Sequence, residues 1–206
     1  MKKIFLVIIL LLLVVGLASV VERNERLSNQ DYSSDPLATQ QDFSSINGDL
    51  VFSVEESVIS WRGTKPGGEH IGFLTLVQGE LLSDLSGSLV IDMTSITSDS
   101  EVLDEHLKSN DFLKVEEYPE AQFVINTIEN GVLFGQLTLL DVTQEIQVPV
   151  QLMEVNESLV IESSFDIDRT DFGIEYGSGS IFDNLGDAII DDTVSITVSL
   201  VATEVE

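Results

Sequence analysis

The sequence predicts an all-β domain of antiparallel strands, arranged as a sandwich or a barrel. Short segments alternate apolar and polar residues with a period of two, as strands do when one face covers a core. About nine such segments follow one another at close spacing, which is typical of both architectures. One segment with helical spacing, residues 100–113, interrupts the series.

The first residues predict an export segment. Lys2 and Lys3 precede an almost unbroken apolar run over residues 4–21, and a positive start followed by an apolar core is typical of a secretory signal. We expect residues 1–21 to be a signal peptide or an uncleaved membrane anchor, because the run approaches the roughly 20 residues that span a bilayer. In both cases we expect the domain outside the cytoplasm, in the periplasm or facing it, with residues 4–21 as the membrane tether if uncleaved.

The rest of the chain divides into two parts by composition. Residues 22–48 are rich in Ser, Asp, Gln and Asn and show no periodicity, so we interpret them as a solvated polar linker. Residues 49–206 carry the alternating segments and are expected to form a single domain. We expect strands at 50–54, 57–62, 70–82, 85–93, 121–128, 132–140, 146–152, 159–167 and 193–200.

Two local signals refine this series. The pair Asn130-Gly131 favours a tight turn, so the strands on either side of it should form a hairpin. In 100–113, an apolar stripe of Val102, Leu103 and Leu107 predicts a helix, with Ser98 or Ser100 as its N-cap. A helix between strands is well placed to cover one end of a barrel.

Several strands are apolar on both faces, among them 70–77 and 132–140. Such strands need either a second layer or a filled interior. A barrel of about eight strands can hold one small ligand, whereas a sandwich fills its centre with side chains. The residues themselves are compatible with two interpretations, a ligand cavity and an ordinary packed core.

The charge of the chain excludes some functions. The formal net charge is −27, with 36 acidic residues spread along the sequence. Such a surface repels nucleic acid, so no nucleic-acid partner is expected. The chain has no cysteine, which excludes disulfides, thiol chemistry and a bacterial lipoprotein anchor.

Five motifs in order resemble the YceI-like family, an exported lipocalin-like domain. The resemblance covers about residues 49–203, and its most specific parts are the third and fifth motifs. The motifs are SWRGTKPGGEHIGF (60–73), GSLVIDMTSI (87–96), DEHLKSNDFLKVEEYPEAQF (104–123), GQLTLLDVTQEI (135–146) and FDIDRTDFGIEYG (165–177). The sequence departs from the family at Asp141, where glycine is usual, and at Leu113, where a second phenylalanine is common.

The resemblance implies an eight-stranded antiparallel lipocalin-like barrel with a short helix covering one end. It also implies an exported binding protein that holds a long apolar ligand in the barrel lumen, such as a polyisoprenoid, an isoprenoid quinone or a fatty-acid derivative. The family is not associated with a fixed enzyme class, so no enzymatic activity and no cofactor are expected.

The candidate ligand-binding residues fall into an apolar wall and a polar set. The wall consists of Trp61, Phe73, Leu76, Phe123, Ile125, Phe134, Leu137, Phe165 and Phe172. In the polar set, Arg62, Lys65 and His70 could form a cationic mouth for a phosphate or carboxylate head group. The alternative is that Arg62 pairs with an acid across the hairpin and Lys65 is solvated. Arg169 completes the set, held by Asp168 or Asp171.

Other functions have weaker support in the sequence. The sequence contains no serine-hydrolase elbow, zinc-protease motif or nucleotide-binding loop. The aspartates of residues 166–171 lack the spacing of a calcium loop, so no metal site is expected. The alternatives are a hydrolase that uses His70, or a structural or adhesive surface domain with a solid core. The sequence leaves the oligomeric state open, a dimer included.

Overall fold

The computed structural model describes residues 38–155 and 158–205. The predicted signal or anchor, residues 1–21, and the linker up to residue 37 therefore lie outside the described residues. In the described part, no helix has the length and apolar character needed to cross a membrane. Residues 39–206 form one compact unit.

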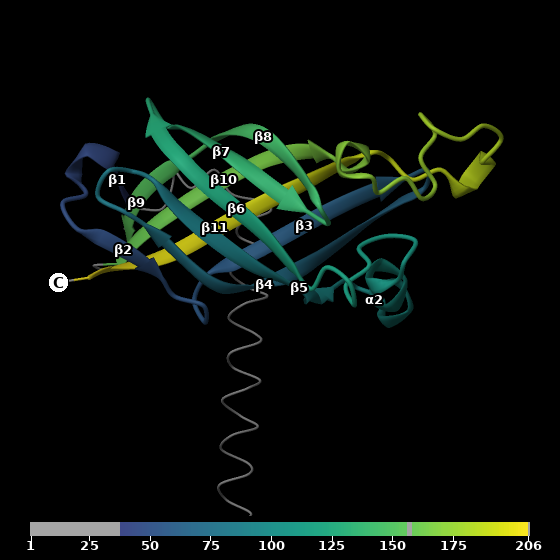
Figure 1. Cartoon of the computed structure of the whole chain (residues 1–206), viewed down its shortest axis with the longest axis horizontal. Helices are drawn as coiled ribbons and strands as arrows, with labels where there is room; N and C mark the ends of the chain where they lie inside the picture. Colours follow the sequence, from purple (N-terminus) through teal and green to yellow (C-terminus); the bar gives the residue numbers. More distant parts are fainter. Residues whose placement is uncertain (1–37, 156–157, 206) are drawn as a thin grey trace, which may run out of the picture. The chain divides into compact units, whose positions relative to one another are not determined.

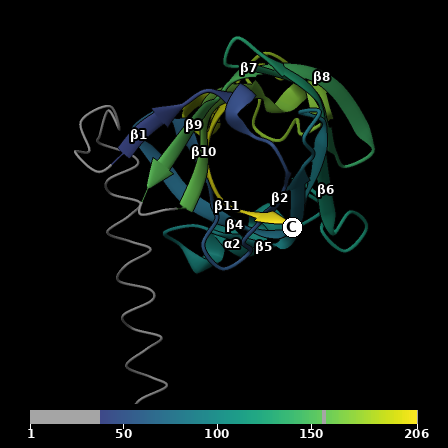
Figure 2. The same cartoon turned by 90° about the vertical axis from the view of Figure 1, so that its left-hand side faces the viewer.

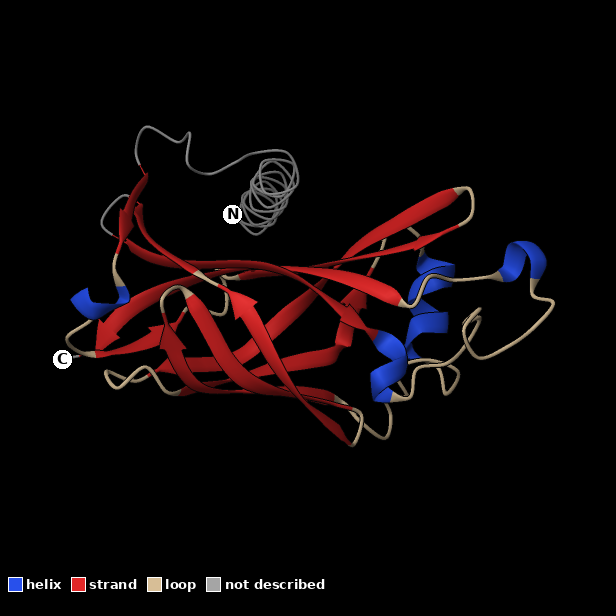
Figure 3. Cartoon of the chain, turned by 90° about the horizontal axis from the view of Figure 1, so that it is seen from above, coloured by secondary structure: helices blue, strands red, loops and turns tan. Residues whose placement is uncertain are grey.

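All the strands in the described residues belong to one antiparallel sheet of eleven strands (Figure 1, Figure 3). The strands are β1 (Ala38–Gln41), β2 (Asp49–Phe52), β3 (Val58–Lys65), β4 (Gly68–Leu81), β5 (Gly87–Thr97), β6 (Glu120–Glu129), β7 (Val132–Leu139), β8 (Val142–Pro149), β9 (Gln151–Val155), β10 (Ser158–Asp168) and β11 (Thr193–Val205). The helices are α2 (Glu101–Lys108) and the short 3-10 turns η2 (Phe43–Ser45), η3 (Arg169–Phe172) and η4 (Gly186–Ala188). The predicted all-β antiparallel fold is confirmed, with more strands than the eight expected.

One of the extra strands arises because β2 and β3 share one place in the sheet. The order is β1-β9-β10-β11-β2-β4-β5-β6-β7-β8, and β3 also pairs with β11 and β4. Both β4 and β11 are long, so each pairs with β3 along one part and with β2 along another.

The single sheet curls round on itself, as the end-on view in Figure 2 shows. Side chains connect β8 to the other side of the seam. Ser163 Oγ on β10 donates to the carbonyl oxygen of Pro149 at 2.7 Å. Gln144 Nε2 donates to the carbonyl oxygen of Asp171 on η3 at 2.9 Å. The sheet therefore forms a barrel and not two stacked layers.

Local signals place most of the connections. Asn130 and Gly131 both have positive φ, 53° and 74°, and join β6 to β7 as predicted. The predicted helix is confirmed but ends at Lys108, because Ser109 is already extended. The residues that follow, up to Leu113, turn inward instead, and Phe112 and Leu113 are buried. Ser100 occupies the N-cap position without a side-chain cap hydrogen bond.

The two ends of the barrel are covered by different segments. Figures 1 and 3 show α2 at one end, and η2 lies at the other. On and beside η2, Phe43 and Ile46 are buried in the core. Residues 38–48, the described part of the predicted linker, are thus folded. Phe43 and Ile46 do not form a periodic pattern, so the sequence did not indicate this fold.

Candidate functional site

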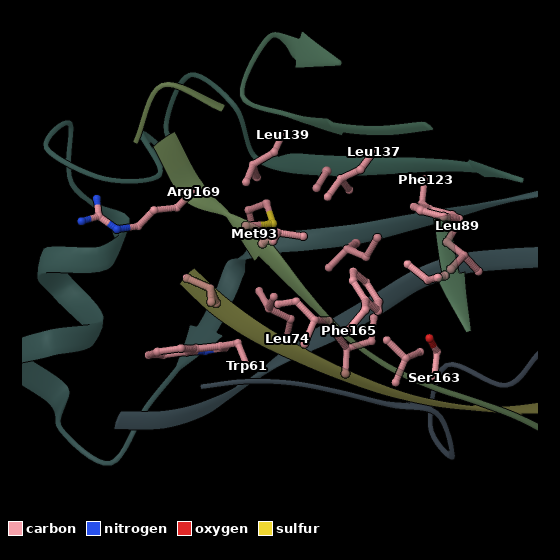
Figure 4. Close-up of a pocket in the computed structure, with 18 of the residues that line it drawn as sticks. Trp61, Leu74, Leu89, Met93, Phe123, Leu137, Leu139, Ser163, Phe165 and Arg169 are labelled. Carbon is pink, nitrogen blue, oxygen red and sulfur yellow. The ribbon is translucent and has the colours of Figure 1, made fainter. Parts of the chain in front are cut away.

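The interior of the barrel contains a cavity of about 240 Å³ with an almost wholly apolar wall (Figure 4). Strands β2 to β8, β10 and β11 contribute to this wall, and so do α2 and the residues that follow it. The cavity is larger than the roughly 150 Å³ apolar cavity that stays dry and takes up benzene in another protein. The interior is therefore not a solid core, and an apolar molecule could enter it without losing hydrogen bonds.

Six of the predicted binding residues line the cavity. They are Trp61, Phe123, Ile125, Leu137, Phe165 and Arg169. The alternation of strands explains their position: Ala121, Phe123 and Ile125 of β6 are buried and line the cavity, whereas Gln122 and Val124 are exposed.

The other six lie outside the lining: Lys65, His70, Phe73, Leu76, Phe134 and Phe172. On β4, Phe73 is followed by Leu74, which lines the cavity, so the Phe73 side chain lies on the opposite face of the strand. Phe134 follows Leu133, which lines the cavity, so its side chain lies on the opposite face of β7. Leu76 and Phe172 are buried in the core beyond the lining.

Sequence reasoning missed several lining residues, among them Leu74, Leu89, Met93, Leu139 and Ser163 (Figure 4). It also missed the inner face of β11, formed by Val194, Ile196, Val198 and Leu200. The period-two alternation of 193–200 already marked that face as buried. What it could not indicate was whether the face meets another layer or an open lumen.

At the α2 end, the residues after the helix close the lumen. Leu107, Phe112 and Leu113 line it from this side. His106 packs edge-on against Phe112 and Tyr176, with ring centroids 5.0 and 4.8 Å apart. His106 therefore joins α2 to the loop after η3, and it is not part of the lining. Leu113, where the family commonly has phenylalanine, leaves more space at this position.

Few polar side chains reach the lining, and each of them has a partner in the protein. Trp61 Nε1 donates to the carbonyl oxygen of Thr97 at 3.1 Å. Ser163 Oγ donates to Pro149 across the seam. Asp191 accepts a hydrogen bond from the hydroxyl of Thr64, and Arg169 is bound on several sides.

Arg169 is a buried structural cation, with 4% of its surface exposed. Its guanidinium donates to the carbonyl oxygens of Ile174, Ile190 and Asp191 at 2.6, 3.1 and 3.1 Å. It also forms a salt bridge with Asp192, with Nη2 and Oδ1 3.1 Å apart. Burial lowers the pKa of Arg169, and the nearby carboxylates oppose that shift.

The predicted partners of Arg169 were wrong. Asp168 accepts hydrogen bonds from Thr170 and caps η3, and the ion pair is made by Asp192. Burial raises the pKa of Asp192, but hydrogen bonds from Ser180 and Ser178 and the charge of Arg169 bring it below its ordinary value. Asp192 is remote in sequence and becomes a neighbour only because β10 pairs with β11.

The cations of the β3–β4 hairpin do not converge on the cavity. Arg62 Nε donates to Glu69 across the hairpin at 2.7 Å, the pairing that was the alternative to a cationic mouth. His70 Nδ1 is hydrogen-bonded to Asp99 at 2.7 Å, and this bond lowers the pKa of Asp99. Lys65 is exposed at the hairpin tip. In residues 38–155 and 158–205, no group of three or more His, Cys, Asp or Glu side chains could hold a metal ion.

The model of the YceI-like domain matches residues 37–202 of this sequence. The chain belongs to the YceI-like family. A UPF0312 protein of Staphylococcus aureus (strain MSSA476) is 26% identical over 143 residues, which cover 65% of this chain and 81% of that protein. The predicted resemblance is thereby confirmed.

Two solved structures share the YceI-like fold. One is a polyisoprenoid binding domain from Saccharophagus degradans implicated in plant cell wall breakdown, with a TM-score of 0.64 and 14% identity, covering 77% of this chain and all of that one (100%). The other is BcnA of Burkholderia cenocepacia, with a TM-score of 0.58 and 20% identity, covering 74% of this chain and 99% of that one. At this level of identity the likeness shows the fold, which is lipocalin-like as predicted.

Proposed function

We propose that this YceI-like domain binds a long apolar molecule, of the polyisoprenoid or related lipid class, inside the barrel. The observation that carries the proposal is the apolar cavity inside the barrel, whose polar side chains already have protein partners. Each methylene moved from water into such a cavity contributes about 0.8 kcal/mol. A hydrocarbon chain could therefore bind tightly without a strong polar contact. The Saccharophagus degradans domain, described as polyisoprenoid-binding, supports the ligand class.

The size of the cavity restricts the shape of the ligand. Its volume of about 240 Å³ lies below the roughly 300–1,000 Å³ that is usual for drug-sized ligands. We expect a slender chain and not a fused ring system. A chain longer than the lumen has to extend beyond it at one end.

The proposal includes export. The support for it is the sequence alone: Lys2 and Lys3 followed by the apolar run of residues 4–21. An exported barrel with this lumen would shield an apolar molecule from water between membranes or at the cell surface.

The test is extraction of the gently purified full-length protein with organic solvent, followed by mass spectrometry. An apolar chain present in stoichiometric amount is the expected result. The variant Leu137→Trp should reduce the yield, because Leu137 is half-buried and lines the cavity. Val124→Trp is the matched control, because Val124 on the neighbouring strand is 43% exposed. Thermal melts should show that both variants are folded.

Two outcomes would overturn the proposal. An extract without lipid, together with failure to bind added isoprenoid probes, would favour a structural or adhesive domain. Turnover of generic ester or phosphate substrates that is lost in His70→Ala would favour a hydrolase. His70 lies outside the cavity lining and is bound to Asp99, so we expect no such turnover.

A further inference from the structure

We propose that the cavity selects ligands whose polar end carries no negative charge, and that Asp191 is the residue that sets this discrimination. The inference rests on the proposed function and adds the charge class of the ligand. It reverses the expectation of a cationic mouth for phosphate or carboxylate head groups, since Arg62 pairs with Glu69, His70 is hydrogen-bonded to Asp99, and Lys65 lies outside the lining.

Apart from Arg169, the side chains that line the cavity in the described residues offer no free donor to an anionic head group. Among them, the indole of Trp61 and the hydroxyl of Ser163 already donate to carbonyl oxygens of the protein. Among the residues that the structure describes, Arg169 is the only lysine or arginine in the lining. A ligand carboxylate would therefore lose its hydration and receive little in return, which is costly in an apolar cavity.

Arg169 does not serve as a binding site for an anionic head group. Its guanidinium is buried, and four of its five N–H donors bind three carbonyl oxygens and the carboxylate of Asp192. In Figure 4 its charged end points away from the labelled apolar side chains. A carboxylate that approached it would have to displace Asp192, which two serine hydroxyls also hold in place.

Negative charge outweighs positive charge at this end of the cavity. Three carboxylates, of Asp192, Asp168 and Asp191, act electrostatically on the single charge of Arg169. Asp191 itself borders the cavity and is exposed. Thr64 donates to it, and within the described residues it forms no salt bridge. The negative charge of Asp191 would repel a ligand carboxylate at this end of the cavity, whereas it would not repel a hydroxyl or carbonyl head group.

The test compares two probes that share one hydrocarbon chain, geranylgeraniol and geranylgeranoic acid. At about pH 8 the acid is ionised, because carboxyl groups have an ordinary pKa of about 4.3. We expect the alcohol to bind roughly tenfold more tightly or better. The affinity for the acid should rise as the pH falls toward its pKa, while the affinity for the alcohol should stay level.

Variants assign the effect to one residue. At about pH 8, Asp191→Asn should reduce the difference in affinity between the alcohol and the acid, and Asp191→Glu should preserve this difference. The control Glu129→Gln removes the same charge from an exposed position at the end of β6, and it should leave the difference unchanged. Melting curves confirm that each variant is folded.

Equal binding of the two probes at about pH 8 would overturn the inference and leave the proposed function standing. A difference that persists unchanged in Asp191→Asn would also overturn the role of Asp191. Binding of neither probe would overturn the proposed function and the inference together.

Discussion

Arg169 and Asp192 form a salt bridge at one end of the barrel, with their side chains only 5% and 18% exposed. Arg169 begins η3 directly after β10, and Asp192 immediately precedes β11. The pair therefore joins the two flanks of the long connection between these strands. Arg169 also holds the carbonyl oxygens of Ile174 and Ile190 within that connection.

Removal of one partner should destabilise the domain strongly. We expect Arg169→Met to reduce the free energy of unfolding by about 3–5 kcal/mol, because it leaves the Asp192 carboxylate without its cation and several carbonyl groups without a donor. Chemical denaturation monitored by circular dichroism measures this. The exposed pair of Arg62 and Glu69 provides the control, since Arg62→Gln should cost less than about 1 kcal/mol. Similar small losses in both variants would contradict a structural role for Arg169.

Gly72 should not tolerate a side chain. A Cβ at this position would overlap the carbonyl oxygen of Thr97 and crowd Trp61 Nε1, the two atoms that form the hydrogen bond at the lumen wall. We expect Gly72→Ala to destabilise the fold by about 3 kcal/mol. Trp61 is the single tryptophan, so its fluorescence should report the loss of this contact. Gly68→Ala, which meets open space, should leave both stability and emission close to the parent.

Glu162 should make stability dependent on pH. It lies between Ile161 and Ser163, which line the cavity, so its carboxyl group lies on the outer face of β10. Burial raises its pKa from 4.5 to about 7. As the pH rises through this range, the unfolded chain releases the proton more readily than the folded one, and the fold loses stability.

The expected result is that Glu162→Gln is more stable than the parent above about pH 7, and equal to it below about pH 4.5. The difference should be about 1 kcal/mol, because the group is partly exposed and solvent screens its charge. Denaturation series at several pH values measure it, with Glu145→Gln on the exposed face of β8 as the control. A variant that is less stable than the parent at high pH would contradict the assigned cause.

Part of the site could be predicted because strand alternation is a local property. On β6 the alternation placed Phe123 and Ile125 correctly inside, and on β7 it placed Leu137. On β4, Phe73 was expected in the wall, but Leu74 lines the cavity. Both faces of this strand carry apolar residues, so alternation separates Phe73 from Leu74 but does not indicate which of them faces inward.

The sequence by itself determined that this chain forms antiparallel strands with one covering helix, belongs to the YceI-like family and carries a large negative charge. The fold class and the charge follow from period-two alternation, helical spacing and residue content, and the family follows from five motifs in order; all of these are read from short stretches of chain. Only the tertiary structure decided which side chains face an open lumen, that Asp192 and not Asp168 forms the ion pair with Arg169, and that Asp191 borders the cavity. Those relationships join residues far apart in sequence, and they exist only once the sheet has curled and β11 has paired with β10.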